Sequence, residues 1–124
     1  MKMIWNASER RKFVRVTFSC EVSVRTFQNL IFPTYTEDIS ASGLRIAISE
    51  ALKPNTLITL TIYGIKKEPL ICQGRIIWVG VRKNDSLQRR LLFDTGIEFQ
   101  QILSEDFEKL KEFISSIAHN KTNS

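Results

Sequence analysis

Strict alternation of apolar and polar residues over positions 14–25 is the feature that most constrains the fold of this chain. Its apolar members are Val14, Val16, Phe18, Cys20, Val22 and Val24. A period of two residues is the signature of a β-strand that buries one face and exposes the other. A strand of this length usually bends around a barrel or crosses between sheets. Arg15 is expected on its polar face, away from the core.

Further strand patterns follow along the chain, and turn signals separate them. The predicted strands are residues 44–48, 58–63, 70–81 and 91–99, and residues 27–35 are predicted to form a hairpin connection with an extended return. Turns or loops are expected at residues 38–43, 51–55, 64–69 and 82–90, the last of them mobile. We also expect Gly74 to mark a bulge or bend. The polar triplet 94–96 is expected to interrupt the last strand.

The last regular element is predicted to be an amphipathic helix. Ser104 is expected at its N-cap, with Glu105 and Asp106 in the first turn, where the helix dipole favours negative charge. Apolar residues at helical spacing share one face, namely Phe107, Leu110, Phe113, Ile114 and Ile117. Five or six consecutive strands followed by one helix predict a mainly β fold, a small antiparallel β-barrel with the C-terminal α-helix packed on it.

Length and composition are those of a single globular domain. The 124 residues suffice for one domain, which we place at residues 9–118, between a flexible segment 1–8 and a frayed tail 119–124. No apolar run approaches the roughly 20 residues of a membrane span, and the N-terminus lacks the apolar core of a signal peptide. We therefore expect a cytoplasmic protein without a membrane span. Cys20 and Cys72 lie in apolar strand patterns and are expected to be reduced core residues.

The inventory of reactive side chains argues against an enzyme. The single histidine, His119, lies at the end of the predicted helix, where it interacts favourably with the helix dipole. No second histidine or cysteine cluster completes a metal site. The sequence also contains neither a P-loop nor a Gly-x-Gly-x-x-Gly fingerprint. We therefore expect no catalytic residue, no metal and no cofactor.

Positive charge is concentrated directly before the first strand. The formal net charge is +5, which favours anionic partners, and Arg10, Arg11, Lys12 and Arg15 fall within six residues. Guanidinium groups fork onto phosphate oxygens, bridge guanine O6 and N7, and stack on bases. Arg11 and Arg15 lie four residues apart, so they can reach one ligand from different directions. Taken alone, however, a basic run before a strand is most often a solvated terminus.

A polar turn at residues 38–43 offers complementary chemistry. The carboxylate of Asp38 suits the N1–H and N2–H donors of guanine, Ser40 adds a hydroxyl, and Gly43 lets the backbone turn tightly or approach a ligand. Each residue also has a simpler explanation. Asp38 and Ser40 serve equally well as caps of local backbone amides, and Gly43 would be explained by a positive φ alone.

The two stretches together resemble the PilZ domain, a bacterial receptor for cyclic di-GMP. The motif Arg11-x-x-x-Arg15 followed by Asp38-x-Ser40-x-x-Gly43 matches the pattern of that family. The surrounding sequence agrees in the lead-in Glu9-Arg10-Arg11, in Gly43-Leu44-Arg45-Ile46 and in Gly96-Ile97-Glu98-Phe99. The resemblance covers residues 8–117, and none of the defining positions departs from the pattern.

The resemblance implies a six-stranded barrel and a ligand, cyclic di-GMP, held between the N-terminal loop and the outer face of the barrel. Arg11 and Arg15 would hold phosphate and guanine, Asp38 and Ser40 would contact a guanine edge, and Gly43 would leave space beside it. Arg10 is the residue that, in some family members, helps to hold a second stacked ligand. The ligand would clamp residues 1–13 against the barrel, creating a surface for a partner.

Two other classes of function stay open at this stage. A nucleic-acid-binding barrel would use the basic loops on a phosphate backbone, but the outward strand faces are short of aromatic residues, so we do not expect a nucleic-acid partner. The other is a protein-interaction module that keeps the fold without the ligand. In the receptor interpretation the downstream partner is a protein of motility, polysaccharide synthesis or regulation. The sequence leaves that choice, the ligand stoichiometry and the oligomeric state undecided.

Overall fold

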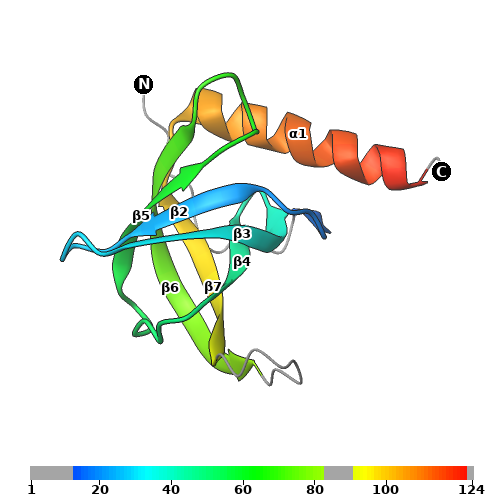
Figure 1. Ribbon diagram of the computed structural model, residues 1–124. Helices are drawn as coiled ribbons and strands as arrows, with labels where there is room; N and C mark the ends of the chain where they lie inside the picture. The colour runs from blue at the N-terminus through cyan, green and yellow to red at the C-terminus, as the bar shows by residue number, and fades with distance from the viewer. Residues whose placement is uncertain (1–12, 83–90, 123–124) are drawn as a thin grey trace.

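The computed structural model describes residues 13–82 and 91–122, which form seven strands and one helix (Figure 1). The strands are β1 (Arg15–Val16), β2 (Glu21–Arg25), β3 (Ile31–Ser40), β4 (Gly43–Ile48), β5 (Leu57–Ile62), β6 (Leu70–Arg82) and β7 (Leu92–Gln101). The helix α1 (Ser104–Thr122) follows. The expected flexible segment 1–8 and the main part of the expected mobile loop, residues 83–90, lie outside the described residues.

Six of the strands close into an antiparallel barrel, which confirms the predicted fold. The order of strands is β1-β3-β2-β5-β6-β7-β4, and an additional pairing between β3 and β4 closes the ring. The closing pairs run from Thr36 opposite Ile46 to Ser40 opposite Gly43, with a register shift between Thr36 and Asp38. The short β1 pairs with the end of β3 outside this ring.

Alternate residues of the strands fill the barrel. Val22 and Val24 of β2 are fully buried, as are Leu60 and Ile62 of the adjacent β5, because side chains on a strand point to opposite faces in turn. Cys20 and Cys72 are buried and unpaired, as predicted.

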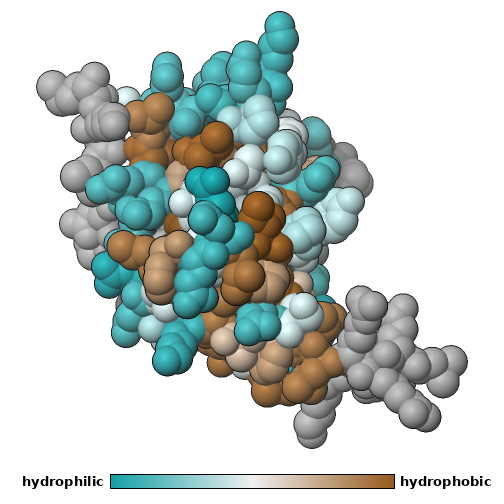
Figure 2. Space-filling view, turned by 60° about the vertical axis from the view of Figure 1, so that its left-hand side comes forward, coloured by the Kyte–Doolittle hydropathy of each residue, from teal (hydrophilic) through white to brown (hydrophobic). Residues whose placement is uncertain are grey.

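The outer faces carry polar residues with scattered apolar ones, and Figure 2 shows apolar groups broken up by polar ones on one face of the molecule. Tyr35 of β3 and Trp78 of β6 are exposed, so the outer faces carry more aromatic surface than expected. In β2 burial therefore follows the alternation seen in the sequence. Before β2 it does so only in part, because Val14 and Phe18, which were expected to face the core, are 60% and 38% exposed.

The first predicted strand is not continuous, contrary to expectation. Residues 17–20 have no strand structure and separate β1 from β2, although both pieces pair with β3. The buried Thr36 bridges the irregular stretch, since its hydroxyl donates to the Phe18 carbonyl and accepts from the Cys20 amide at 2.8 Å. A side chain thus satisfies backbone groups that would otherwise need ladder partners.

Two further expectations about β-structure were wrong, whereas a third was confirmed. β7 runs without interruption through residues 94–96, because it lies between β4 and β6 and pairs with both. The expected turn at 38–43 is shorter, since Asp38–Ser40 belong to β3 and Gly43 begins β4, leaving only Ala41 and Ser42 between them. The β6–β7 register shifts between Gln73 and Gly74, and the extra residue is Gln100 of β7, so Gly74 marks a bulge in the strand opposite it.

The helix lies across one end of the barrel, as Figure 1 shows. Leu110 and Ile114 are buried, and two edge-to-face aromatic pairs, Phe13 with Phe107 and Phe18 with Phe113, join the helix to the residues around β1. The first helical bond runs from the Phe107 amide to the Leu103 carbonyl, so Leu103 takes the cap position expected for Ser104.

The helix continues to Thr122, through four residues (119–122) of the expected frayed tail 119–124. Residues 123–124 lie outside the described part. Over residues 13–82 and 91–122, no helix has the length and apolar character that a bilayer crossing needs.

Candidate functional site

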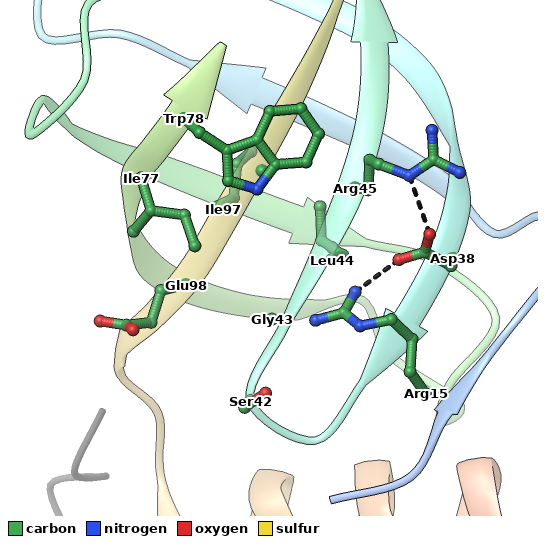
Figure 3. Close-up of a pocket in the computed structure, with 11 residues that line it drawn as sticks. Arg15, Asp38, Ser42, Gly43, Leu44, Arg45, Ile77, Trp78, Ile97 and Glu98 are labelled. Atoms are coloured by element: carbon green, nitrogen blue, oxygen red, sulfur yellow. Dashed lines mark hydrogen bonds and ion pairs between the residues drawn. The ribbon is translucent and has the colours of Figure 1, made fainter. Parts of the chain in front are cut away.

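A pocket of about 390 Å³ lies on the outer wall of the barrel, where β1, β3, β4, β7 and β6 run side by side (Figure 3). Its lining consists of Arg15, Asp38, Ser42, Gly43, Leu44, Arg45, Ile77, Trp78, Gly96, Ile97 and Glu98. These residues come from five strands and one turn. The pocket therefore exists only because the barrel brings distant segments together.

Strand register places four of the lining residues in one row. Asp38 lies opposite Arg45, Arg45 opposite Gly96, and Gly96 opposite Trp78. Residues directly opposite each other on adjacent strands point to the same face and contact one another. The row thus runs from a carboxylate through a guanidinium to an indole across β3, β4, β7 and β6.

Arg15 and Asp38 form an ion pair at one side of the pocket. Arg15 lies opposite Ser40 in the β1–β3 pairing, one diagonal step from Asp38, and its Nη1 donates to Asp38 Oδ1 at 2.5 Å. The Arg15 side chain is 47% exposed and that of Asp38 16%. Arg15 is therefore available to a ligand, and Asp38 is a sheltered acceptor beside it.

Arg45 holds the second oxygen of the same carboxylate. Its Nε donates to Asp38 Oδ2 at 2.8 Å, and its Nη1 lies 3.4 Å from Asp94 Oδ1. The hydrogen bond to Asp38 raises the pKa of Arg45 above its usual range, with smaller contributions from neighbouring acidic groups and an opposing effect of burial. Figure 3 shows Arg15 and Arg45 approaching Asp38 from opposite sides.

The chain of ion pairs continues beyond Asp94. Arg82 donates from Nη2 to Asp94 Oδ1 at 2.6 Å and from Nη1 to Glu37 Oε1 at 2.9 Å. The bond to Asp94 is the main reason that the pKa of Arg82 is also raised. Alternating charges therefore connect the pocket to the far end of β6. A fixed network of this kind orients its members better than an isolated exposed pair does.

Trp78 lies directly over Gly96. A Cβ at Gly96 would fall 2.1 Å from Trp78 Nε1 and 2.4 Å from Cε2, so only glycine leaves room for the indole in this position. Trp78 is 42% exposed. The indole is consequently held against β7 with part of its surface open, as a stacking platform requires.

Gly43 is explained by close packing of two strands. A Cβ there would lie 2.2 Å from the carbonyl oxygen of Ile97 and 3.1 Å from Glu98 Cα. Gly43 does not have the positive φ that offered the simpler explanation; among the described glycines, Gly64 has it. Close approach of β4 to β7 therefore accounts for the glycine without a ligand.

Ser40 is buried and does not line the pocket. Its hydroxyl shares a 2.7 Å hydrogen bond with the Ser42 hydroxyl and accepts from the Ser42 amide at 3.1 Å. These bonds fix the two-residue turn between β3 and β4. In this structure Ser40 has the local capping role named above as the simpler explanation.

The structure thus gathers three of the six predicted site residues. Arg15, Asp38 and Gly43 line one pocket, Ser40 lies buried next to it, and Arg10 and Arg11 lie outside the described residues. Arg45 and Trp78 also line the pocket, but they were not predicted from the sequence. The sequence does show an arginine on the polar side of a strand and a tryptophan in the 70–81 strand. Only the strand register shows that the two lie in one row, on either side of Gly96.

The arrangement suits binding of a polar, aromatic anion. A guanidinium provides donors for phosphate, a sheltered carboxylate accepts paired N–H donors, and an open indole face stacks on a planar ring. Within residues 13–82 and 91–122 no group of three or more His, Cys, Asp and Glu side chains lies close enough to hold a metal ion.

Comparison with known proteins identifies the family and the fold. The family model described as PilZ domain matches residues 9–116. No curated protein matches the sequence. Solved structures with the same fold include the PilZ domain of YcgR from Escherichia coli with c-di-GMP, at a TM-score of 0.72 and 13% identity, over 92% of this chain and 95% of that one.

Two longer proteins contain the same fold. The Bacillus subtilis inhibitor of motility, MotI/DgrA, matches with a TM-score of 0.71 and 17% identity over 90% of this chain. MrkH, described as a c-di-GMP-dependent transcription regulatory factor, matches with a TM-score of 0.70 and 14% identity over 88% of this chain. The chain spans only about half of each of these proteins, 52% and 51%. At these identities the likeness shows the fold.

Proposed function

Because the chain belongs to the PilZ family, whose domain covers residues 9–116, we propose that it is a receptor for cyclic di-GMP. The observation that carries the proposal is the meeting of Arg15, Asp38 and Trp78 around one pocket. These residues come from separate strands, and together they offer a cation, an acceptor and an aromatic face. A guanine nucleotide presents a matching partner for each of the three.

Each residue then has a distinct role. Arg15 binds phosphate and, through its plane, the guanine ring, and Arg10 and Arg11 join it by their positions in the family motif. Asp38 accepts the N1–H and N2–H donors of guanine. Trp78 stacks on the base, an interaction worth about 1–3 kcal/mol per base. Ser40 and Gly43 act indirectly, through the turn and the strand packing that place Asp38.

Binding on this view is a switch without chemistry. In the structure Arg15 is paired with Asp38, so a ligand phosphate must compete for Arg15 while guanine takes its place at Asp38. The phosphates would also draw the arginines of residues 9–15 onto the barrel. Each charge-assisted hydrogen bond gained contributes about 1.5–3 kcal/mol, against roughly 1–2 kcal/mol for each backbone residue ordered.

The output is proposed to be a contact with another protein. The described part of the chain contains one barrel and its helix, so the surface made by the ligand and the N-terminal residues is the natural place for a partner. Such a partner would be a cytoplasmic protein of motility, polysaccharide synthesis or regulation. The chain itself carries out no reaction in this proposal.

Calorimetric titration with cyclic di-GMP tests the proposal, with GTP as a second ligand. We expect saturable binding that Arg15→Ala and Asp38→Ala each weaken roughly ten- to a hundredfold, the loss expected for one charge-assisted contact. Arg25→Ala is the matched control, since it removes the same charge from an exposed site on β2 that does not line the pocket.

Two results would contradict the receptor function. The first is the absence of heat and of any thermal shift with a folded protein, which would leave a protein-interaction module of the PilZ fold. The second is equal weakening by Arg15→Ala and Arg25→Ala, which would indicate general charge attraction. The fitted stoichiometry separates one ligand from a stacked pair.

A further inference from the structure

We propose that Arg45 is a positioning residue that aims Asp38 at guanine and thereby makes the site selective for the 2-amino group of the base. The inference rests on the proposed function, because it concerns how the same pocket distinguishes its ligand. Arg45 lies in the stretch after Gly43 that also agrees with the family, but it is not one of the defining residues of the two motifs and the resemblance gives it no role. Its role follows from contacts in the structure alone.

Among the ion pairs of the described residues Asp38 has two partners, Arg15 and Arg45, and they differ in exposure and in the oxygen that they hold. Arg15 holds Oδ1 from the edge of the barrel, with nearly half of its side chain exposed, whereas Arg45 holds Oδ2 from the neighbouring β4. In the proposed complex Arg15 turns to phosphate. Arg45 is then the residue left to fix the orientation of the carboxylate.

The position of Arg45 is itself fixed from two sides. Its Nε is committed to Asp38 at 2.8 Å, and its Nη1 faces Asp94 at 3.4 Å. Asp94 is in turn held by Arg82 at 2.6 Å. Because a guanidinium is planar, with its donors in a fixed fork, contacts at both ends determine the direction from which Nε meets Asp38.

The hydrogen-bonding capacity of the Asp38 carboxylate permits Arg45 and guanine to bind it at the same time. An ionised carboxylate offers about four lone-pair sites on two oxygens. Arg45 occupies one site on Oδ2, and departure of Arg15 frees Oδ1 completely. Two sites on Oδ1 and one on Oδ2 therefore remain, so each oxygen can accept one of two parallel donors, the N1–H and N2–H of guanine.

Arg45 also compensates the charge that would otherwise oppose binding. A carboxylate only 16% exposed next to a ligand with two phosphates would experience repulsion once Arg15 had left it. Arg45 keeps one positive charge beside the Asp38 carboxylate both before and after the ligand binds. Charge compensation alone would raise the affinity for every cyclic dinucleotide equally, whereas correct aim matters only for ligands that carry both donors.

Cyclic di-IMP separates these two effects, because it differs from cyclic di-GMP only in lacking the 2-amino groups. We expect the wild-type protein to bind cyclic di-GMP roughly tenfold or more tightly than cyclic di-IMP, as loss of one charge-assisted hydrogen bond predicts. In Arg45→Ala we expect the ratio to fall to within about twofold of one, the scatter of independent effects. Arg25→Ala should retain the wild-type ratio.

Arg45→Lys distinguishes geometry from charge. Lysine keeps the positive charge but is a single flexible point donor, so it cannot contact both Asp38 and Asp94 in the same fixed way. We expect it to recover most of the affinity lost in Arg45→Ala and little of the selectivity. Asp94→Asn perturbs the other end of Arg45 and should lower the ratio too, which provides a test if Arg45→Ala does not fold.

The outcomes separate the two proposals. If wild-type protein binds cyclic di-GMP but does not distinguish it from cyclic di-IMP, or if Arg45→Ala and Asp94→Asn keep the full ratio, the role of Arg45 is refuted and the receptor function stands. If wild-type protein binds neither ligand, the receptor function fails and the inference fails with it.

Discussion

Gly43→Ala is expected to destabilise the protein whether or not a ligand is present. A methyl group at this position would lie 2.2 Å from the Ile97 carbonyl oxygen, about 1.2 Å short of the 3.4 Å at which ordinary contact begins. The obstacle is backbone, so no side-chain rotation relieves it. Either β4 must move away from β7 or both strands must distort.

The cost can be worked out from the neighbouring contacts. Overpacking of this kind costs about 1–3 kcal/mol. Separation of the strands also strains the bond from the Phe99 amide to the Ser42 carbonyl, 2.9 Å long, and a weakened hydrogen bond adds about 1 kcal/mol. We therefore expect a loss of about 2–4 kcal/mol from a total stability of about 5–15 kcal/mol.

Urea denaturation without ligand is the appropriate assay. With a slope of about 2 kcal/mol per molar urea, the middle of the usual range, the midpoint should fall by roughly 1–2 M. Gly80→Ala on β6 is the control, since a Cβ there meets nothing within 4 Å; it should change stability by no more than about 1 kcal/mol. A Gly43→Ala protein with the wild-type midpoint would refute the strand-packing explanation.

Three further predictions follow from contacts described above. Trp78→Ala should weaken cyclic di-GMP binding by roughly ten- to a hundredfold and Trp78→Phe by much less, as measured by calorimetry; equal losses would argue against stacking. Thr36→Val should lower the free energy of unfolding by about 1–3 kcal/mol, because the Phe18 carbonyl and Cys20 amide lose their shared partner; an unchanged urea midpoint would contradict this. Burial raises the pKa of the Cys72 thiol from 9.0 to about 12, so the folded state binds more protons than the unfolded state in that range and stability should fall as the pH rises from about 9 toward 12. Cys72→Ala should lack this part of the alkaline loss in pH-dependent denaturation, and an identical profile would count against the assignment.

Local patterns predicted the elements of the barrel well. Burial of one face explains the alternation in β2 and the helical spacing in α1, and a sequence displays such periods directly. The turn residues before β6 mark the place where the chain reverses. The register shift beside Gly74 was predictable for a different reason, since a glycine in a strand often marks a bulge. Expectations were wrong where contacts with a distant part of the chain decided the outcome. The hydroxyl of Thr36 permits the break at residues 17–20, and pairing on both sides keeps residues 94–96 in β7.

The site was predictable only in part, for a related reason. Arg15 and Asp38 belong to a recognisable spacing, and the structure brings them into contact. Arg45 and Trp78 join them through the rows of residues across β4, β7 and β6, and no short motif encodes such a row. Ser40 shows the converse, because a residue that matches the motif lies buried in the turn that it stabilises.

The position of the pocket on the strands that complete the barrel has a consequence for biosynthesis. Gly43, Leu44 and Arg45 of β4 form their side of the pocket only after β7 has inserted between β4 and β6, about fifty residues later in the chain. Long-range pairings of this kind form slowly, because a long loop must close before any contact offsets its entropy. A nascent chain that has emerged only as far as β6 contains Asp38, Arg15 and Arg45 but lacks β7, whose residues 96–98 line the pocket between β4 and β6. Under the proposed function, newly made molecules should therefore become able to bind the nucleotide in one late step, when the last strand docks.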